Sequence, residues 1–342
     1  MSVRTSPASP RVVVAIDKFR STASASDLAS TIVRALGPTA DVDAVRVSDG
    51  GEGFRRSFAG VTRTIQVRGP WGDVHDAPMT RFGVGGETWG VVEVAEIIGR
   101  SIREVPTSRE ALAASSAGVG DALILAARDD LDRVVVGCGG SATSDGGEGC
   151  YDVWRWAGSP LSLTAATDIT ATFLGAVRYA EQKGIDESEL GLLARRLDAV
   201  AVRYQRESGR DVLPVERTGA AGGLAGGLYA LGADLVSGFE EVARASRLAE
   251  RIADARVVIT GEGRFDAGSL DGKVVSGVCA LTTENQRVLV VCGAADLAAV
   301  GQLEIRQPWV HVESLVSRFG ERRARAMTLA CVAEVVEGFM AT

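Results

Sequence analysis

Short apolar runs alternate along the chain with longer segments in which apolar residues recur every three or four positions. Arg11–Ile16 (RVVVAI), Arg133–Gly137 (RVVVG) and Val257–Thr260 (VVIT) are rich in β-branched residues, which is typical of strands buried on both faces. Helical periodicity is found over Asp27–Leu36 and over Ser188–Glu207. Buried strands that alternate with helices predict an α/β fold with a parallel sheet.

The pattern changes between Thr62 and Val94, where apolar and polar residues alternate and are interrupted by glycine and proline. This alternation predicts an antiparallel meander, and we place a domain boundary there. Farther on, Ser108–Ala127 has helical periodicity but carries Gly118 and Gly120 in its middle. Because each glycine costs about 1 kcal/mol relative to alanine in a helix, this pair predicts either close backbone packing or a break.

Glycines cluster in four places at the ends of apolar runs. The clusters are SDGGEG at Ser48–Gly53, GCGGSATSDGGEG at Gly137–Gly149, TGAAGGLAGGL at Thr218–Leu228 and GEGRFD at Gly261–Asp266. Backbone N–H groups on such turns, and at the helix starts that follow them, are ready ligands for phosphate. Since ligands of open α/β sheets bind outside the carboxyl ends of the strands, these turns predict a site for a charged ligand.

Charged residues lie on or beside these turns. The carboxylates are Asp17, Asp49, Asp145, Asp168, Glu262 and Asp266, and the cations are Lys18, Arg20, Arg264 and Lys273. Phosphoryl transfer from a nucleotide needs such groups, because carboxylates hold Mg²⁺ and orient or deprotonate the acceptor hydroxyl, while cations neutralise the phosphates. Each residue also fits a plainer role. Asp49 and Asp145 fit the capping of turns or helices, Ser141 fits an N-cap, and Glu52 fits the first turn of a helix over Glu52–Ala59.

Other nucleotide-binding patterns are absent from the sequence. It contains no G-x-G-x-x-G, and Gly268–Val274 (GSLDGKV) is one residue short of a P-loop, with Val274 where Ser or Thr would hold Mg²⁺. A net charge of −7 without a basic cluster argues against a nucleic-acid surface. No continuous apolar segment approaches the ~20 residues that span a bilayer, so no membrane partner is expected.

Cysteine and histidine usage points away from disulfides and histidine-ligated metal sites. The five cysteines have no CxxC spacing, and three lie within or beside apolar runs, which predicts a reduced, cytoplasmic protein with buried thiols. The two histidines, His75 and His311, are too few for a metal site, and we expect them to be structural.

In these motifs the chain resembles a known family, the two-domain glycerate kinases that phosphorylate glycerate with ATP. The matching segments run in the family's order from about residue 11 to residue 295: VVVAIDKF, SDGGEG, GPWG, VVEVA, the GxG at Gly118, GCGGSATSDGG, TDI, QKG at Gln182, GAAGGLAGGL and VITGEGRFDAGSLDGKVVSGV. GGSATSDGG and ITGEGRFD are the specific signals among them. The sequence around the two SDGGEG copies does not repeat, so we interpret them as two turns of one site and not as a duplicated domain.

The resemblance implies a Rossmann- or flavodoxin-like parallel-sheet domain, residues 1–62 and 250–342, with a second α/β domain, residues 63–249, inserted into it. It also implies a site in the cleft between the two domains. ATP and Mg²⁺ are the implied phosphoryl donor and metal. The implied acceptor is D-glycerate, with 2-phosphoglycerate as the product, so the expected partners are small molecules.

We interpret the charged residues with this resemblance in view. Asp168 and Asp266 are the candidate base and acceptor-orienting carboxylates, and Asp49 and Arg264 are the other catalytic candidates. Asp49 and Asp145 are also the candidate Mg²⁺ contacts. The candidates for contact with substrate or phosphate are Asp17, Lys18, Arg20, Glu52, Gly139, Gly140, Ser141, Asp145, Gly222, Gly223, Glu262 and Lys273.

The chain departs from the family pattern in three motifs and in a shortened middle region, since it is shorter than its relatives between Gly149 and Asp168 and in the loop before Gln182. Asp17-Lys18-Phe19-Arg20-Ser21 stands where relatives read Asp-Ser-Phe-Lys-Gly, and Asp168–Thr172 (DITAT) replaces Asp-Val followed by Asn-Pro. Gly268 stands where the family has glutamine. A catalytically impaired member that binds a nucleotide or an organic acid therefore stays open beside the kinase, whereas the missing G-x-G-x-x-G disfavours an oxidoreductase.

Overall fold

A computed structural model of the chain describes residues 10–19, 22–51, 53–102, 106–157, 161–270 and 274–341. The chain divides into two compact units, unit 1 (Met1–Ser48 and Val242–Thr342) and unit 2 (Asp49–Glu241). Unit 1 is therefore discontinuous in sequence, and unit 2 is inserted into it. The domain boundaries expected from the sequence, at 62/63 and 249/250, stay a prediction.

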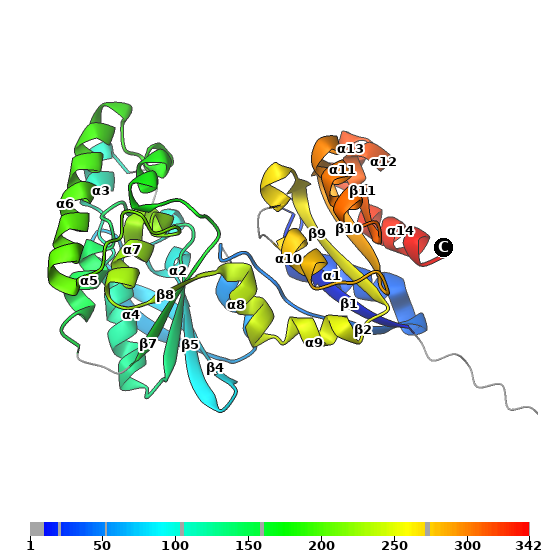
Figure 1. The fold of residues 1–342 in the computed structure, drawn as a ribbon, viewed down its shortest axis with the longest axis horizontal. Coiled ribbons are helices and arrows are strands. Elements are labelled where there is room, and N and C mark those ends of the chain that lie inside the picture. The colour runs from blue at the N-terminus through cyan, green and yellow to red at the C-terminus, as the bar shows by residue number, and fades with distance from the viewer. Residues whose placement is uncertain are drawn as a thin grey trace, which may run out of the picture. The chain divides into compact units, whose positions relative to one another are not determined.

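Unit 1 is built on a sheet of five parallel strands (Figure 1). They are β1 (Arg11–Ile16), β2 (Asp41–Ala44), β9 (Val257–Phe265), β10 (Arg287–Ala295) and β11 (Val310–Ser314). Their order across the sheet is β2-β1-β9-β10-β11, which is the flavodoxin-like order and confirms the fold predicted for this part of the chain. The order reverses between β1 and β9, the point at which open α/β sheets bind ligands.

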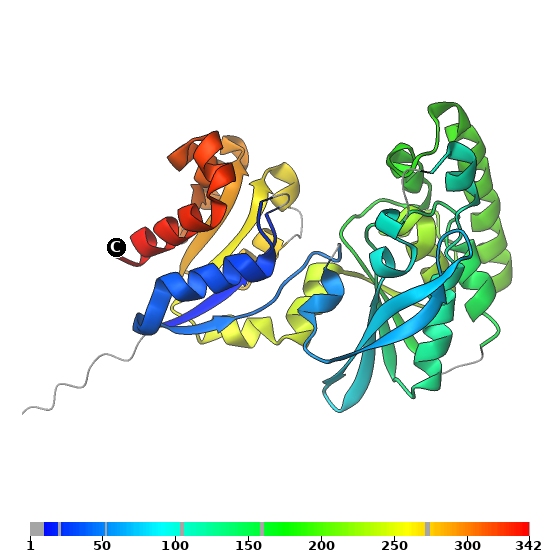
Figure 2. The same cartoon turned by 180° about the vertical axis from the view of Figure 1, so that it is seen from behind.

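Helices cover both faces of this sheet. α1 (Ala25–Leu36) and α14 (Thr328–Ala341) lie side by side over one face, where Val12 and Val14 share a core cluster with Val335 (Figure 2). Because alternate side chains of a strand point to opposite faces, Val13 points to the other face, and α10 (Val274–Ala280) contacts β1 and β9 there. The remaining helical segments of unit 1 are η1 (Gly37–Thr39), α9 (Leu248–Ala253), η8 (Ala267–Leu270), α11 (Leu297–Arg306), α12 (Leu315–Phe319) and α13 (Glu321–Ala326), and α8 (Gly238–Ala245) crosses the boundary between the units.

Unit 2 contains a mixed sheet of six strands, which run across it in chain order. They are β3 (Val61–Arg68), β4 (Val74–Val84), β5 (Glu87–Glu93), β6 (Arg133–Gly137), β7 (Ser162–Thr167) and β8 (Asp234–Ser237). β3, β4 and β5 form the antiparallel meander that the alternating pattern predicts, and β5, β6, β7 and β8 are parallel. The carboxyl ends of four strands therefore meet at one edge of this sheet.

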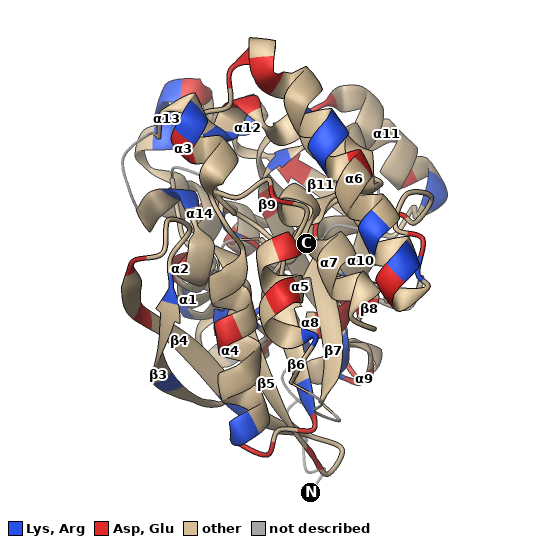
Figure 3. Ribbon diagram, turned by 90° about the vertical axis from the view of Figure 1, so that its left-hand side faces the viewer, with Lys and Arg blue, Asp and Glu red and all other residues tan. Residues whose placement is uncertain are grey.

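Helices enclose the core of unit 2, and its outer helix, α6 (Leu190–Ser208), confirms the predicted amphipathic segment. Leu193, Leu197 and Tyr204 of α6 are buried, while its basic and acidic residues are mixed along the outer side (Figure 3). The other helical segments are η2 (Phe54–Ser57), α2 (Val94–Ile98), η3 (Arg100–Ile102), α3 (Ser108–Ala113), α4 (Ala117–Arg128), α5 (Glu148–Trp154), η4 (Phe173–Tyr179), η5 (Glu181–Lys183), η6 (Glu187–Glu189), η7 (Ala220–Gly223) and α7 (Leu224–Ala230).

Two expectations about the glycine clusters were wrong. The helix expected over Glu52–Ala59 is only the 3₁₀ turn η2, whose N-cap Gly53 has a left-handed φ of 92°. The cluster Gly261–Asp266 is not a turn, because β9 continues through it to Phe265. The glycine is needed there for close strand packing, since a Cβ at Gly261 would lie 2.0 Å from the carbonyl oxygen of Val291.

The glycines of the segment Ser108–Ala127 show the close backbone packing that was predicted as one alternative, and both lie inside α4. Residues 114–116 break the segment into α3 and α4, and a Cβ at Gly118 would lie 1.8 Å from the carbonyl oxygen of Arg68. Ser108–Arg128 is also the one segment in the described part of the chain with the length and hydropathy of a membrane helix. Half of its apolar window is buried inside the protein, as in core helices of globular domains.

The close contact at Gly118 predicts a loss of stability on substitution. Gly118→Ala forces a Cβ against the Arg68 carbonyl, so we expect the free energy of unfolding to fall by about 1–3 kcal/mol. Gly191→Ala is the matched control in the same unit, because a Cβ there would meet only the Arg195 side chain, at 3.8 Å. Urea unfolding of both variants tests this, and equal midpoints would contradict it.

Candidate functional site

Two carboxylates of unit 2 come together beside glycines at the carboxyl ends of its parallel strands. Asp168 follows β7 directly, and Asp49 stands two residues before Gly51. A Cβ at Gly51 would lie 3.1 Å from Asp49 Oδ1 and 3.9 Å from Asp168 Oδ2, so both carboxylates border this glycine. Gly139, which follows β6, packs on the same residue, because its Cβ would lie 2.8 Å from Gly51 Cα. The structure thus brings together three predicted site residues that are far apart in sequence.

Glu93, the last residue of β5, ties the first glycine turn to this edge of the sheet. Its carboxylate accepts hydrogen bonds from the backbone N–H groups of Gly53, at 2.8 Å, and of Arg55, at 3.1 Å. The pKa of Glu93 is raised, because the effect of burial outweighs the opposing effect of these two hydrogen bonds. The Arg55 guanidinium donates to both carboxylate oxygens of Glu96, at 2.6 and 2.9 Å. This buried network fixes the turn that carries Asp49.

The turn after β6 contains Gly139, Gly140 and Ser141, and Lys183 of η5 holds it. Lys183 Nζ donates to Ser141 Oγ at 3.0 Å and to the carbonyl oxygen of Thr143 at 2.6 Å. Gly140 has a φ of 68°, a conformation that glycine adopts without strain. Ser141 and Lys183 are both buried, with 3% and 7% of their surface exposed.

Lys183 is a charged residue of the site that the sequence interpretation missed as a candidate. Burial lowers the pKa of its ammonium group to about 7, and Arg100 acts in the same direction while Asp145 opposes it. The signal that could have identified it is its place in QKG, one of the segments that match the glycerate kinases.

Close packing explains Gly222 and Gly223, which were expected to bind phosphate. A Cβ at Gly222 would lie 2.0 Å from the carbonyl oxygen of Thr143, and one at Gly223 would lie 2.7 Å from Gly146 Cα. Gly146 N also donates to the Gly222 carbonyl oxygen at 3.0 Å. The two glycine turns therefore pack backbone to backbone, and a phosphate contact at Gly222 or Gly223 stays a prediction.

Asp145, in the second SDGGEG, is a buried hydrogen-bond acceptor. Its Oδ2 accepts from the Ser116 N–H and hydroxyl, both at 2.8 Å, and from Gly149 N at 3.2 Å. Its Oδ1 accepts from Gly147 N at 3.1 Å. These bonds satisfy donors near the starts of α4 and α5. The carboxylate is therefore fully engaged within the fold.

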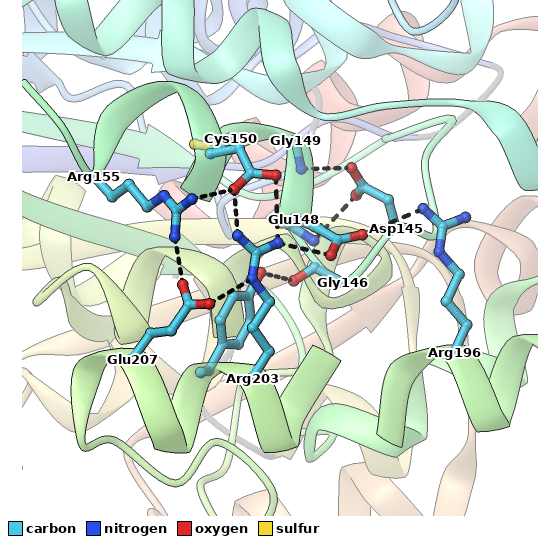
Figure 4. A network of polar contacts seen from close by, with 12 residues as sticks. Asp145, Gly146, Glu148, Gly149, Cys150, Arg155, Arg196, Arg203 and Glu207 are labelled. Atoms are coloured by element: carbon cyan, nitrogen blue, oxygen red, sulfur yellow. Dashed lines mark hydrogen bonds and ion pairs between the residues drawn. The ribbon is translucent and has the colours of Figure 1, made fainter. Parts of the chain in front are cut away.

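Glu148, the next acidic residue of this copy, belongs to an ion-pair network between α5 and α6 (Figure 4). Arg203 donates to Glu148 at 2.8 Å and to Glu207 at 3.1 Å, and Arg155 also pairs with Glu207. In the first SDGGEG the aspartate borders Gly51 together with Asp168, whereas in the second the acidic residues join helices.

In unit 1, Asp17 and Lys18 follow β1 at the point where the strand order reverses. Asp17 N donates to the carbonyl oxygen of Gly261 in β9 at 3.0 Å, and Asp17 Oδ1 accepts from Lys18 N at 2.8 Å. Glu262 lies beside them in β9, paired with Cys292 of β10. Both Asp17 and Lys18 are partly exposed, so the reversal point of this sheet carries charged groups of both signs.

Arg264 and Asp266 lie together at the end of β9. Their side chains form an ion pair of 3.6 Å, and the Arg264 side chain is 75% exposed. Asp266 Oδ1 also accepts from Gly268 N at 3.0 Å, which makes an Asx turn at the start of η8. Three other candidates, Arg20, Glu52 and Lys273, lie outside the residues that the structure describes.

No group of three or more His, Cys, Asp and Glu side chains is arranged to hold a metal ion within the described ranges. The five cysteines are buried free thiols, as the sequence predicts. Burial raises the pKa of Cys279 and of Cys292 to about 12, so both stay protonated at neutral pH.

The structure is a two-unit α/β fold with a carboxylate pair beside a glycine turn at the carboxyl ends of parallel strands, where open α/β sheets bind their ligands. The sequence model of the Glycerate kinase family matches residues 12–153 and 156–328. The chain therefore belongs to the glycerate kinase family, and this membership makes it a kinase.

Named relatives support the assignment. The chain is 32% identical over 312 residues to the glycerate 2-kinase of Escherichia coli, covering 78% of this chain and 81% of that protein. It is 32% identical over 311 residues to a glycerate kinase of Halalkalibacterium halodurans, with 78% and 80% covered. An uncharacterised protein of Mycobacterium tuberculosis is 37% identical over 287 residues, with 79% and 75% covered. The crystal structure of a glycerate kinase 2 from Salmonella typhimurium LT2 matches with a TM-score of 0.76 and 25% identity, covering 97% of this chain and 99% of that one.

The buried lysine predicts a pH dependence of stability. The pKa of Lys183 is lowered to about 7 from the ordinary 10.5, so between these values the folded protein binds fewer protons than the unfolded chain. Lys183 therefore makes stability rise with pH across this range, by at most about 1.4 kcal/mol per pH unit. Below pH 7 the cost of burying the charge is fully present.

Lys183→Met isolates this effect, because it fills the same space without a titratable group. Urea unfolding from about pH 6.5 to about pH 9.5 should show wild type gaining stability relative to Lys183→Met as pH rises. A difference that does not change with pH would contradict the lowered pKa.

The two SDGGEG copies predict opposite phenotypes for the same substitution. Asp145→Asn places an amide N–H₂ or a weaker acceptor against donors that Asp145 now satisfies, so the thermal midpoint should fall clearly. Among the described donors only Gly51 N, at 3.1 Å, donates to Asp49, so Asp49→Asn should change the midpoint little. Thermal unfolding of both variants checks this, and a larger loss in Asp49→Asn would refute it.

Proposed function

We propose that this protein transfers the γ-phosphoryl group of ATP to D-glycerate, with Mg²⁺, and releases 2-phosphoglycerate and ADP. The observation that carries the proposal is the pair Asp49 and Asp168, which border Gly51 and the turn at Gly139. Membership of the glycerate kinase family supports the choice of substrate. A cytoplasmic location, in organic-acid metabolism, is part of the proposal.

Asp168 is the proposed general base. Its carboxylate takes the proton of the acceptor hydroxyl as that oxygen forms a bond to the γ-phosphorus, and the bond to the ADP oxygen breaks. Asp49, beside it, orients the acceptor. The backbone N–H groups of Gly139, Gly140 and Ser141 provide donors for phosphate oxygens. Arg264 and Asp266 of unit 1, which form one ion pair, are a proposed charge-neutralising group and a second acceptor-orienting carboxylate.

Asp49 fits a magnesium contact better than Asp145 does. Mg²⁺ in kinases is held by one or two carboxylates together with phosphates and waters. Asp49 Oδ1 accepts one backbone hydrogen bond, whereas the Asp145 oxygens accept four donors of the fold. When bound, Mg²⁺ would neutralise charge on the ATP phosphates. We therefore assign the metal contact to Asp49 alone.

Asp17, Lys18 and Glu262 form a second proposed contact region, at the reversal point of the unit 1 sheet. Ligands of flavodoxin-like sheets bind at this point, and Lys18 supplies a positive charge there. We assign these residues to substrate or phosphate binding, with Arg20, Glu52 and Lys273 as further candidates from the sequence.

The direct test is an assay of ADP release with purified protein, Mg²⁺-ATP and D-glycerate, with the phosphate position of the product determined by ³¹P NMR. Release of ADP together with 2-phosphoglycerate is expected. If no ADP is released but ATP or D-glycerate raises the unfolding temperature, the protein binds these ligands without phosphorylating glycerate, and the proposal fails. Phosphorylation of a different hydroxy acid would correct the acceptor.

Asp168→Asn tests the base. We expect kcat to fall by about 10²- to 10⁴-fold without loss of the folded state, because the amide cannot accept the hydroxyl proton. Arg264→Ala should also lower turnover without unfolding the protein. Asp132→Asn is the control, since Asp132 accepts from Thr88 N at the amino ends of β5 and β6, the opposite edge of the sheet. Wild-type turnover in Asp168→Asn or Arg264→Ala would remove that residue from the site.

A further inference from the structure

Arg217 stands in an unusual backbone conformation beside the strand that carries Asp168. Its φ of 74° is left-handed, which among non-glycine residues of the described chain is shared only by Asp130, Ala221 and Arg247. A left-handed backbone is costly for a residue with a Cβ and persists where the surrounding structure enforces it. An outlier of this kind beside a candidate site is a reason to ask what its side chain contributes there.

The loop around Arg217 is held from several sides. Arg217 N donates to the carbonyl oxygen of Thr170 at 3.2 Å, and Gly219 N donates to that of Ala171 at 3.0 Å. The Thr218 hydroxyl donates to the carbonyl oxygen of Val215 at 2.6 Å. This loop is therefore fastened to the segment that follows Asp168, and the conformation of Arg217 is imposed by its neighbours.

The guanidinium of Arg217 lies at the carboxyl end of β7. Its Nη1 donates to Thr167 Oγ1 at 3.2 Å, and Thr167 is the residue immediately before Asp168. The Thr167 hydroxyl in turn donates a hydrogen bond to the carbonyl oxygen of Ile169, at 3.1 Å. One nitrogen of the guanidinium, Nη1, is thus held by the hydroxyl oxygen of the buried Thr167.

The rest of the guanidinium has no counterion within the ranges that the structure describes. No carboxylate lies within 4.0 Å of it, and Nη2 and Nε make no hydrogen bond to a described residue. The side chain is half-buried, so water is only partly available to it. A planar guanidinium with two free donor positions matches a carboxylate, which it binds through two parallel hydrogen bonds.

We propose that Arg217 binds the carboxylate of the acceptor hydroxy acid and so selects an anionic acceptor. The inference rests on the proposed function, because it takes the acceptor to be a small 2-hydroxy acid. Asp49 and Asp168 are both negative and would repel such a substrate, so a cation beside them is needed to hold it. Arg217, whose guanidinium donates to Thr167 immediately before Asp168, supplies this charge.

Arg217→Gly tests the proposal without damaging the backbone. Glycine adopts the left-handed conformation freely, so this variant should be at least as stable as wild type while it loses the carboxylate contact. We expect the KM for D-glycerate to rise about 10- to 100-fold and the KM for ATP to stay within about twofold. Arg217→Lys keeps the charge but not the paired hydrogen bonds, so its KM should lie between the two.

A binding measurement separates this inference from the proposed kinase activity. D-glycerate alone should raise the unfolding temperature of wild type, the neutral glyceramide should not, and Arg217→Gly should lose the response. Arg210→Ala is the control, because Arg210 lies in the same segment but donates to the carbonyl oxygen of Tyr229 at 3.2 Å. Its response to D-glycerate should match that of wild type.

Three results would overturn the role of Arg217. They are a wild type that D-glycerate does not stabilise, an Arg217→Gly variant that it stabilises as well as wild type, and equal stabilisation by glyceramide. If wild type shows the selective response but releases no ADP, the proposed kinase reaction fails while the carboxylate contact stands.

Discussion

Backbone-to-backbone contact between glycine turns is the constraint on which the site of unit 2 depends. Gly139 lies against Gly51 Cα, and Gly222 lies against the carbonyl oxygen of Thr143, so closely that a Cβ at Gly139 or Gly222 would collide with main-chain atoms. Interiors are packed too densely for a neighbour to give way by an ångström. The positions of Asp49 and Asp168 follow from this packing, since each carboxylate is carried on or beside a turn that has one place to lie.

The same six residues, SDGGEG, do different work in their two settings. In the first copy Glu93 accepts hydrogen bonds from Gly53 N and Arg55 N, and Asp49 accepts from one described donor, Gly51 N. At residues 144–149 the turn starts α5, and the donors around that helix start and α4 converge on Asp145. An identical sequence thus gives a carboxylate for ligand chemistry in one place and a structural cap in the other, because the surrounding donors differ.

Lys183 and Arg217, two basic residues of unit 2, differ in how deeply they are buried. Lys183 is buried, and its ammonium group donates hydrogen bonds to two neutral acceptors, the Ser141 hydroxyl and the carbonyl oxygen of Thr143. Burial without a direct carboxylate partner disfavours the charged form of Lys183. We therefore assign it to holding the glycine turn in place and not to attracting a charged ligand. Arg217 stays half-buried, and its permanent charge suits the task of holding an anion near two carboxylates.

The sequence by itself determined the α/β class, the antiparallel meander, the core strands and the family, because periodicity and motif order are local properties. It also identified Asp49, Asp168 and Gly139 as candidates. Only the tertiary structure decided that these three residues lie around Gly51 and that Asp145 accepts hydrogen bonds from the starts of α4 and α5. It also decided that GEGRFD continues a strand. It alone revealed Lys183 and Arg217. Lys183 lies in the matching segment QKG, but its hydrogen-bond partners, like those of Arg217, come from residues distant along the chain.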